Sequence, residues 1–534
     1  MKLSYSKIWG ICFIIAFVIL FISSPDSYTH DLYQRTDSAN FFTSGKSLMK
    51  GLIPYSDFTD SKGPLLWTIY GLGYLISHYD YIGVFWLSVI FYSFTFFYIF
   101  KIADIFLNNQ RLSLFVVILM MSCFFSPWFH YEVRAEDWAQ LFIVLTFYRI
   151  CLFLYTEKGK EPSSLYLSCF ILGICLIGTF FIKYNITVMI GIACIYMLYA
   201  IIQEKKNILL SFLSLIGGII LLALPWIGYT LYLGCFDAFI NEYFINTLQT
   251  VGSDNNLANY LHEWLFLTYD THTILLFAVP CIGAIAMSQK VHHYRYFFLI
   301  TFLGFFAIAI HRCVFLHWYY LSVCLFFPIW LFIYIAKTTI NVKVINSIAV
   351  VAISYTIISN CFFWGFLTPT WFFRDSEARA QFYKASYYMS QIENPTIIYY
   401  LCGTLGLETP VDGIPATTYW TTQIGATDSM MTSQIKAMLS GVSDFIVAAD
   451  NEEFPISGTD SLIKQNGYHE LMKFRTIETD FVLYSKHQVK NPPKEFHISI
   501  YDILLKRNIF KNKKQYVCNT KIIDDLRTCS YEEE

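Results

Sequence analysis

The stretch RTDSANFFTSGKSLMKGLIPYSDFTDSKGPLLW, residues 35–67, decides the architecture that we expect for this chain. It follows an apolar segment at 8–24. The spacing of its apolar residues and lysines predicts a short amphipathic helix over 38–50 that lies along a membrane surface and ends at Gly51. Residues 64–79 are apolar but too short for an ordinary span, which favours an interfacial or re-entrant helix. The stretch therefore predicts a surface loop with two short helices.

The composition places this loop in a membrane protein. The chain has 534 residues, of which 56% are hydrophobic and 14% charged, with a formal net charge of −2. Soluble domains carry about 25% charged residues. The values exclude an ordinary soluble enzyme, a disordered chain and a nucleic-acid binder with a basic face. Half of the charged residues, 38, lie in 1–365 and 38 lie in the much shorter segment 366–534, so a polytopic membrane part precedes a water-soluble part.

Apolar runs of membrane-spanning length predict eleven transmembrane helices in the first part, residues 1–365. They cover residues 8–24, 82–106, 112–129, 138–156, 165–182, 186–203, 208–233, 273–288, 297–311, 317–336 and 344–365.

The basic residues give these spans a direction. If 64–79 does not cross the membrane, every second short loop carries two cations, as the inner side of a membrane should. The cations are Lys101 and Arg111, Lys158 and Lys160, Lys205 and Lys206, Lys290 and Arg295, and Lys337 and Lys343, joined by Lys2 and Lys7 before the first span. The N-terminus is therefore expected inside and the soluble part outside.

The outer part reads as a small α/β domain over 366–487, followed by a charged tail over 488–534. Short buried strands are expected at 396–401 and 444–448, a hairpin-like pair at 468–474 and 481–484, and a helix at 429–439. Cys518 and Cys529 could form a disulfide in an oxidising compartment, and their spacing alone leaves this open.

The predicted topology brings the unusual ionisable residues of the membrane part to the outer face, where such residues usually face a cavity or a partner. They lie in the loop 25–81, in 130–137, in the tight turn 183–185 and in 311–317: Asp37, Asp57, Asp60, Lys62, Arg134, Glu136, Asp137, Lys183, Arg312 and His317.

The first of these loops resembles the first outer loop of GT-C membrane glycosyltransferases. The resemblance rests on Asp37-Ser38 followed by Phe41-Phe42, on the Pro-Tyr-x-Asp-Phe string at 54–58, and on Lys62-Gly63-Pro64. The pattern is similar to the bacterial branch that includes protein O-mannosyltransferases and the aminoarabinose transferases of lipid A. It implies a multi-span GT-C fold with an active site on the outer face of the bacterial cytoplasmic membrane. It also implies a polyprenyl-phosphate-linked sugar as donor.

Later segments carry the same resemblance. Arg134-Ala135-Glu136-Asp137 resembles the acidic pair that opens the fourth span of this branch, and Lys183-Tyr184-Asn185 resembles its cation between spans five and six. Arg312 and the string from His317 to Tyr320 resemble a late outer loop. Protein O-mannosyltransferases carry Asp-Glu where this chain has Asp37-Ser38, which argues against transfer of mannose to protein.

The chemistry explains why such a site needs these residue types. An acceptor hydroxyl or amine loses a proton as it attacks, and a carboxylate can take that proton. The leaving phosphate gains charge, which fixed cations stabilise. We therefore expect Asp37 to be the general base of an inverting transfer. The expected phosphate-binding residues are Lys62, Lys183 and Arg312, and the expected substrate-orienting residues are Arg134, Glu136, Asp137 and His317.

Structural roles remain open for several of these side chains. Asp57 and Asp60 either coordinate a divalent cation or stabilise the loop. Asp37 could cap the surface helix, and Lys183 could extend from a span end.

Structural alternatives also apply to three other positions: Glu136 and Asp137 could be solvated loop acids, and Arg312 could pair with lipid headgroups. At the level of function, the alternatives are a transporter of polysaccharide or lipid-linked sugar, a surface-polysaccharide polymerase and a non-catalytic scaffold. A transporter is expected to place ionisable groups near mid-membrane.

Overall fold

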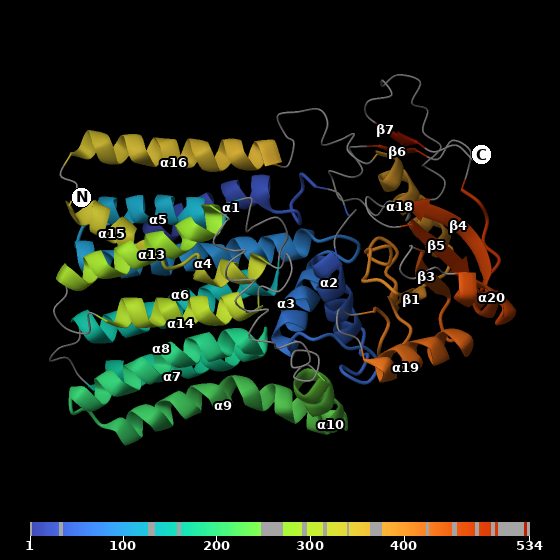
Figure 1. Cartoon of the computed structure of the whole chain (residues 1–534), viewed down its shortest axis with the longest axis horizontal. Coiled ribbons are helices and arrows are strands. Elements are labelled where there is room, and N and C mark those ends of the chain that lie inside the picture. The colour runs from blue at the N-terminus through green and yellow to red at the C-terminus, as the bar shows by residue number, and fades with distance from the viewer. Residues whose placement is uncertain are drawn as a thin grey trace.

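Apolar helices form the larger part of the structure, and a small sheet domain lies at one end of them (Figure 1). The computed structural model describes residues 3–30, 32, 36–126, 134–156, 162–246, 271–290, 296–312, 318–338, 341–363, 376–422, 427–450, 457–475, 480–492, 497–499 and 528–530.

Each of the eleven apolar segments expected to span the membrane holds a helix in the described part. These helices are α1 (Tyr5–Ser23), α4 (Ile82–Leu107), α5 (Gln110–Phe124), α6 (Ala135–Thr156), α7 (Pro162–Phe180), α8 (Tyr184–Gln203), α9 (Ile208–Tyr232), α13 (Thr271–Lys290), α14 (Phe297–Arg312), α15 (Ile329–Thr338) and α16 (Val342–Phe363).

Seven of these segments are long and apolar enough to cross a membrane by themselves, counting α15 together with the residues from Leu321 onward. The apolar parts of α5, α7, α13 and α14 are shorter, at 10–17 residues. Local sequence explains several helix ends. The Asn109 side chain accepts hydrogen bonds from the Arg111 and Leu112 amides at the start of α5, and the Asn207 side chain accepts from the Leu210 amide at the start of α9. The expected multi-span helical architecture is confirmed.

Two short helices interrupt this series, as the loop sequence predicts, but the expectation that the first lies along a membrane surface is wrong: it is buried between the second helix and the C-terminal domain, and its Lys46 is completely buried. They are α2 (Thr36–Met49) and α3 (Pro64–Ile76), with Pro64 in the first turn of α3. Gly51 lies just beyond the end of α2 with a φ of +86°, and the Leu52 amide donates to the Ser47 carbonyl. This is the glycine C-cap expected from the sequence. Shorter elements are α10 (Phe236–Phe239), the π-helix η1 (Ile240–Asn246) and the 3-10 helix η2 (Trp318–Cys324).

The C-terminal domain is built on a five-stranded sheet with the order β2-β1-β3-β5-β4. The central strand β3 pairs in parallel with β1 and antiparallel with β5. Its elements are α18 (Ser376–Met389), β1 (Thr396–Tyr400), β2 (Ile414–Pro415), α19 (Asp428–Leu439), β3 (Phe445–Asp450), α20 (Ser457–Gln465), β4 (His469–Arg475) and β5 (Asp480–Ser485). The α/β fold class and each expected strand and helix are confirmed, whereas α18, α20 and β2 were not expected.

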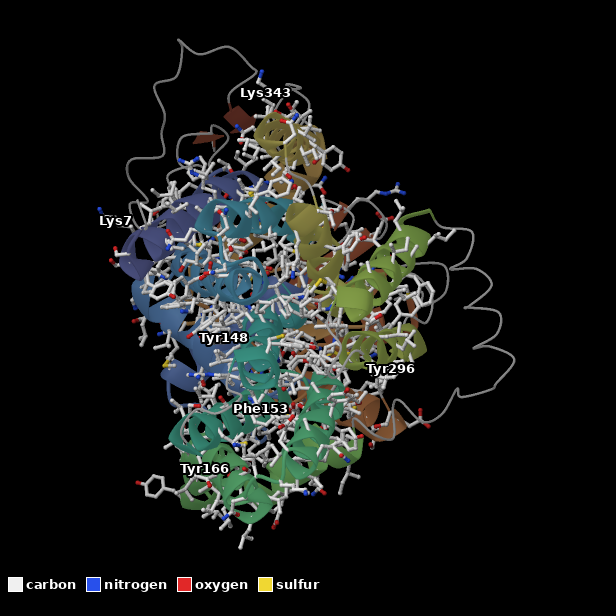
Figure 2. All side chains as sticks on the ribbon, turned by 90° about the vertical axis from the view of Figure 1, so that its left-hand side faces the viewer. Lys7, Tyr148, Phe153, Tyr166, Tyr296 and Lys343 are labelled. Carbon is white, nitrogen blue, oxygen red and sulfur yellow. The ribbon has the colours of Figure 1, made fainter. Side chains whose placement is uncertain are left out.

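Two short antiparallel strands of the tail, β6 (His497–Ser499) and β7 (Thr528–Ser530), are described. Cys518 lies outside the described residues, so the disulfide to Cys529 stays a prediction. The helices α2 and α3 lie between the bundle and the sheet domain (Figure 1). Figure 2 views the bundle from the end that lies away from the sheet domain. It shows Lys7 and Lys343, two of the cations expected on the inner side of the membrane.

Candidate active site between the first loop and the start of the fourth span

The segment Lys62-Gly63-Pro64 is fixed to the tight turn between α7 and α8 by backbone hydrogen bonds. The Gly63 amide donates to the Ile182 carbonyl at 3.1 Å, and the Leu65 amide donates to the Phe181 carbonyl at 2.9 Å. A Cβ atom on Gly63 would lie 2.3 Å from the Phe181 carbonyl oxygen, so the close approach requires glycine here. The contact brings Lys62 next to the turn that carries Lys183.

Lys183 forms a buried ion pair with Glu136, which lies in the first turn of α6. Its Nζ atom is 2.5 Å from Glu136 Oε1, and the two side chains are 9% and 2% exposed. A buried charge is costly unless it is paired, so removing either partner would leave the other buried without its ion pair. Glu136 is therefore not a solvated loop acid, and Lys183 does not extend along a lipid surface.

The neighbouring Asp137 has a different environment. One carboxylate oxygen accepts from the Arg134 backbone amide at 2.9 Å, and the other accepts from the Tyr92 hydroxyl at 3.0 Å. Arg134 directly precedes α6, so Asp137 caps the free amides at the helix start in the manner of a capping box. These contacts give Asp137 a structural role. The Arg134 side chain is buried beside it, at 7% exposure.

Lys62 connects this turn to α2. Its Nζ atom lies 5.7 Å from the centroid of the Phe41 ring, in a cation–π contact, and 3.8 Å from Asp60 Oδ1. Phe41 follows Asp37 by one helical turn on α2, so the two side chains share a face of that helix. Asp37 is half-buried in the first turn. The helix that carries Asp37 is thus linked to Lys62 through Phe41, and Lys62 is linked to the Lys183–Glu136 pair through the contact of Gly63 with the turn.

The two other loop acids, Asp57 and Asp60, have different environments. The exposed Asp57 accepts a 2.7 Å hydrogen bond from the Ile53 amide within its own turn, whereas Asp60 is buried at 4% exposure. In the described part of the chain, no three His, Cys, Asp or Glu side chains are placed to hold a metal ion together.

The structure leaves two candidates without a described side-chain position. Arg312 is the last residue of α14, and its side chain lies outside the described part, as does the whole of His317.

Sequence analysis missed the contribution of the C-terminal domain to this region. The Thr59 amide donates to the Thr418 carbonyl at 3.0 Å, and the Thr418 hydroxyl donates to the Ser56 carbonyl. The Tyr419 hydroxyl donates to Glu242 at 2.7 Å. The loop that carries Thr418 therefore packs against the segment that leads to Asp60 and Lys62. Its residues are more than 350 positions away in sequence, and no local pattern marks the contact.

Comparison with known proteins identifies the fold. No family model matches the sequence, and no curated protein matches it. Among solved structures, the chain is similar to ArnT from Cupriavidus metallidurans bound to undecaprenyl phosphate, with a TM-score of 0.62, 9% identity, and coverage of 91% of this chain and 99% of that one. The apo state of the same protein gives a TM-score of 0.60 at 10% identity, with the same coverage. The chain therefore has the GT-C fold, as its first loop predicted.

Proposed function

We propose that this protein transfers a sugar from a polyprenyl-phosphate-linked donor to an acceptor hydroxyl or amine. One observation carries the proposal. Two cations, Lys62 and Lys183, come from distant segments to the same end of the bundle, next to the helix that carries Asp37 in its first turn. A site with fixed cations beside a carboxylate suits the departure of a phosphate and the deprotonation of an acceptor. The likeness in fold to ArnT, which was solved with undecaprenyl phosphate, supports a polyprenyl-phosphate leaving group.

In the proposed reaction, the acceptor oxygen or nitrogen attacks the anomeric carbon of the donor sugar. The bond from that carbon to the phosphate oxygen breaks, and polyprenyl phosphate leaves with the electron pair. Asp37 takes the acceptor proton, and Lys62 and Lys183 stabilise the charge that grows on the phosphate. Attack opposite the leaving group inverts the anomeric centre. Glu136 holds the Lys183 ammonium in position, and Arg312 is proposed as a third phosphate ligand.

The same proposal includes an orientation in the membrane. Lys7 and Lys343 lie at the end of the bundle opposite the sheet domain (Figure 2). Because basic residues favour the cytoplasmic side, we place the N-terminus there and the site with the C-terminal domain on the outer face. No nucleotide sugar is supplied on that face, which favours a lipid-linked donor. The acceptor is then a glycan, a lipid or a protein at the cell envelope.

The test is an assay of purified protein with a panel of polyprenyl-phosphate sugars that are labelled in the sugar, supplied with a membrane extract as acceptor. We expect one donor to release polyprenyl phosphate and to pass its label to an acceptor in equal amounts. A transporter would move the donor across a vesicle membrane without release of phosphate. Movement without release would overturn the proposal in favour of that alternative.

A further inference from the structure

A buried carboxylate of the C-terminal domain is bonded to the helix that carries Asp37. Glu408 is completely buried, and its Oε1 atom accepts a 2.7 Å hydrogen bond from the Thr43 hydroxyl of α2. The Thr404 hydroxyl donates to the same oxygen at 2.9 Å, and the Tyr399 hydroxyl donates to Oε2 at 2.6 Å. Both oxygens are thus held by three fixed donors, of which one belongs to α2.

A second contact lies one helical turn further along α2. Lys46 is completely buried, and its Nζ atom donates to the backbone carbonyl of Glu408 at 3.2 Å. Burial lowers the pKa of Lys46 to about 8, although the nearby carboxylates of Asp412 and Glu408 act in the opposite direction, and Lys50 adds to the lowering. The charges around Lys46 are therefore arranged to retain a cation at a site where burial disfavours it.

The opposite side of α2 is held as closely by α3. A Cβ atom on Gly45 would lie 2.4 Å from the Gly71 backbone nitrogen, so the two helices meet backbone to backbone. The helix α2 is thus fixed between α3 and the C-terminal domain (Figure 1). Thr43 follows Asp37 by six residues, which is about 9 Å along a helix. A shift at Thr43 would therefore pass directly to Asp37.

We propose that Glu408 is a positioning residue for sugar transfer: through Thr43 and Lys46 it sets the position of α2, and hence of Asp37 relative to Lys62. This inference rests on the proposed function. It assigns the C-terminal domain a part in the active site itself, in addition to any handling of the acceptor.

The chemistry of the cluster supports a role in positioning α2 more than a role in stabilising the fold. Apolar residues of similar volume at a buried ion pair are often as stable or more stable, so such a pair is weak evidence for stability. Its best-attested use is to fix one register between two elements, because any other register leaves a charge buried without a partner. The contact between α2 and the domain is a buried polar cluster that can serve the same use: Thr43 donates to the Glu408 carboxylate, and Lys46 donates to the Glu408 backbone carbonyl. Another register would leave the carboxylate and the ammonium buried with fewer partners.

The experiment compares Thr43→Val, Thr43→Ser and Glu408→Ala with the control Asp444→Asn in purified full-length protein. Asp444 is a carboxylate of the same domain that accepts from Thr396 and His487. Two readouts are taken: kcat and KM for the polyprenyl-phosphate sugar, and hydrogen exchange of the amides of residues 36–49.

We expect Glu408→Ala to lower kcat by about 10²-fold with little change in KM, as a displacement of about 1 Å does in other active sites. Thr43→Val should lower kcat by about tenfold, and Thr43→Ser should restore it, because serine keeps the donor hydroxyl. Exchange over 36–49 should rise in Thr43→Val and Glu408→Ala and stay at the wild-type rate in Asp444→Asn.

Two results would overturn the inference: equal kcat in Thr43→Val and Thr43→Ser, or exchange over 36–49 that rises as much in Asp444→Asn as in Glu408→Ala. A wild-type protein without transferase activity would instead count against the proposed function. The exchange comparison would still decide whether Glu408 holds α2.

Discussion

The backbone amide of Gly63 donates a hydrogen bond of 3.1 Å to the carbonyl of Ile182, the residue before Lys183. Together with the bond from the Leu65 amide to the Phe181 carbonyl, this contact joins the loop before α3 to the turn between α7 and α8, and it places two lysines in one region. Because it uses backbone atoms at a position where a side chain does not fit, it fixes the loop independently of the charges that it brings together.

Gly63→Ala is therefore expected to separate the two lysines. The added methyl group would lie 2.3 Å from the Phe181 carbonyl oxygen, so the loop must move away. We expect at least a tenfold loss of kcat/KM and a destabilisation of about 1–3 kcal/mol, as for other overpacked sites. Gly10→Ala is the matched control, because a Cβ atom there meets nothing within 4 Å. Equal activity in both variants would contradict the role of the contact.

The Lys183–Glu136 pair gives a prediction that separates stability from catalysis. Glu136→Gln or Lys183→Met alone leaves one buried charge unpaired, at a cost of about 3–5 kcal/mol. The double variant removes both charges, so thermal unfolding in detergent should return toward the wild-type temperature. Transferase activity should not return, because the phosphate ligand is still absent. Recovery of activity in the double variant would remove Lys183 from the site.

Lys62→Ala is expected to raise KM for the donor and to lower kcat, because its ammonium would contact the phosphate in both the ground state and the transition state. Lys62→Arg keeps a cation and should retain part of the activity. Lys464→Ala, on the outer surface of α20, serves as the control for loss of a lysine. Unchanged kinetics in Lys62→Ala would exclude a contact with the phosphate.

The lowered pKa of Lys46 predicts how stability depends on pH. The pKa is about 8 in the folded protein against 10.5 for the free side chain, so between these values the unfolded state binds more protons. The cost of burying the cation is fully present below pH 8 and is removed as pH rises toward 10.5. Relative to Lys46→Met, the wild type should gain up to about 1.4 kcal/mol per pH unit across this window. Denaturant unfolding of both proteins at pH 7.5, 9 and 10 measures this gain. The same change of unfolding free energy with pH in the wild type and in Lys46→Met would contradict the prediction.

Local sequence predicted the elements that carry the candidate site. The helix that begins before Asp37, its glycine cap at Gly51 and the proline at the start of α3 each follow from residues within a few positions of one another. The charge pattern also placed Lys62 and Lys183 on one face. It did not predict the Gly63–Ile182 contact that joins them, because hydrogen bonds between distant backbones have no signature in side-chain type.

Two further features show where local patterns end. Glu136 and Asp137 are adjacent acids that carry the same charge, yet one pairs with Lys183 and the other caps α6. Only the direction of each side chain on the helix separates them. The hydrogen bond between Thr43 and Glu408 joins residues 365 positions apart, so no local pattern marks it. The spacing of Lys46 is that of an exposed lysine on an amphipathic surface helix, whereas the structure buries it.

The most direct test of the account is a single-turnover measurement with Asp37→Asn. The variant keeps the size of the side chain but cannot take a proton, so we expect release of polyprenyl phosphate to fall by at least about 10²-fold while donor binding is retained. Asp460→Asn, in the C-terminal domain, should react like the wild type. Release by Asp37→Asn at the wild-type rate would contradict the assignment of Asp37 as the base.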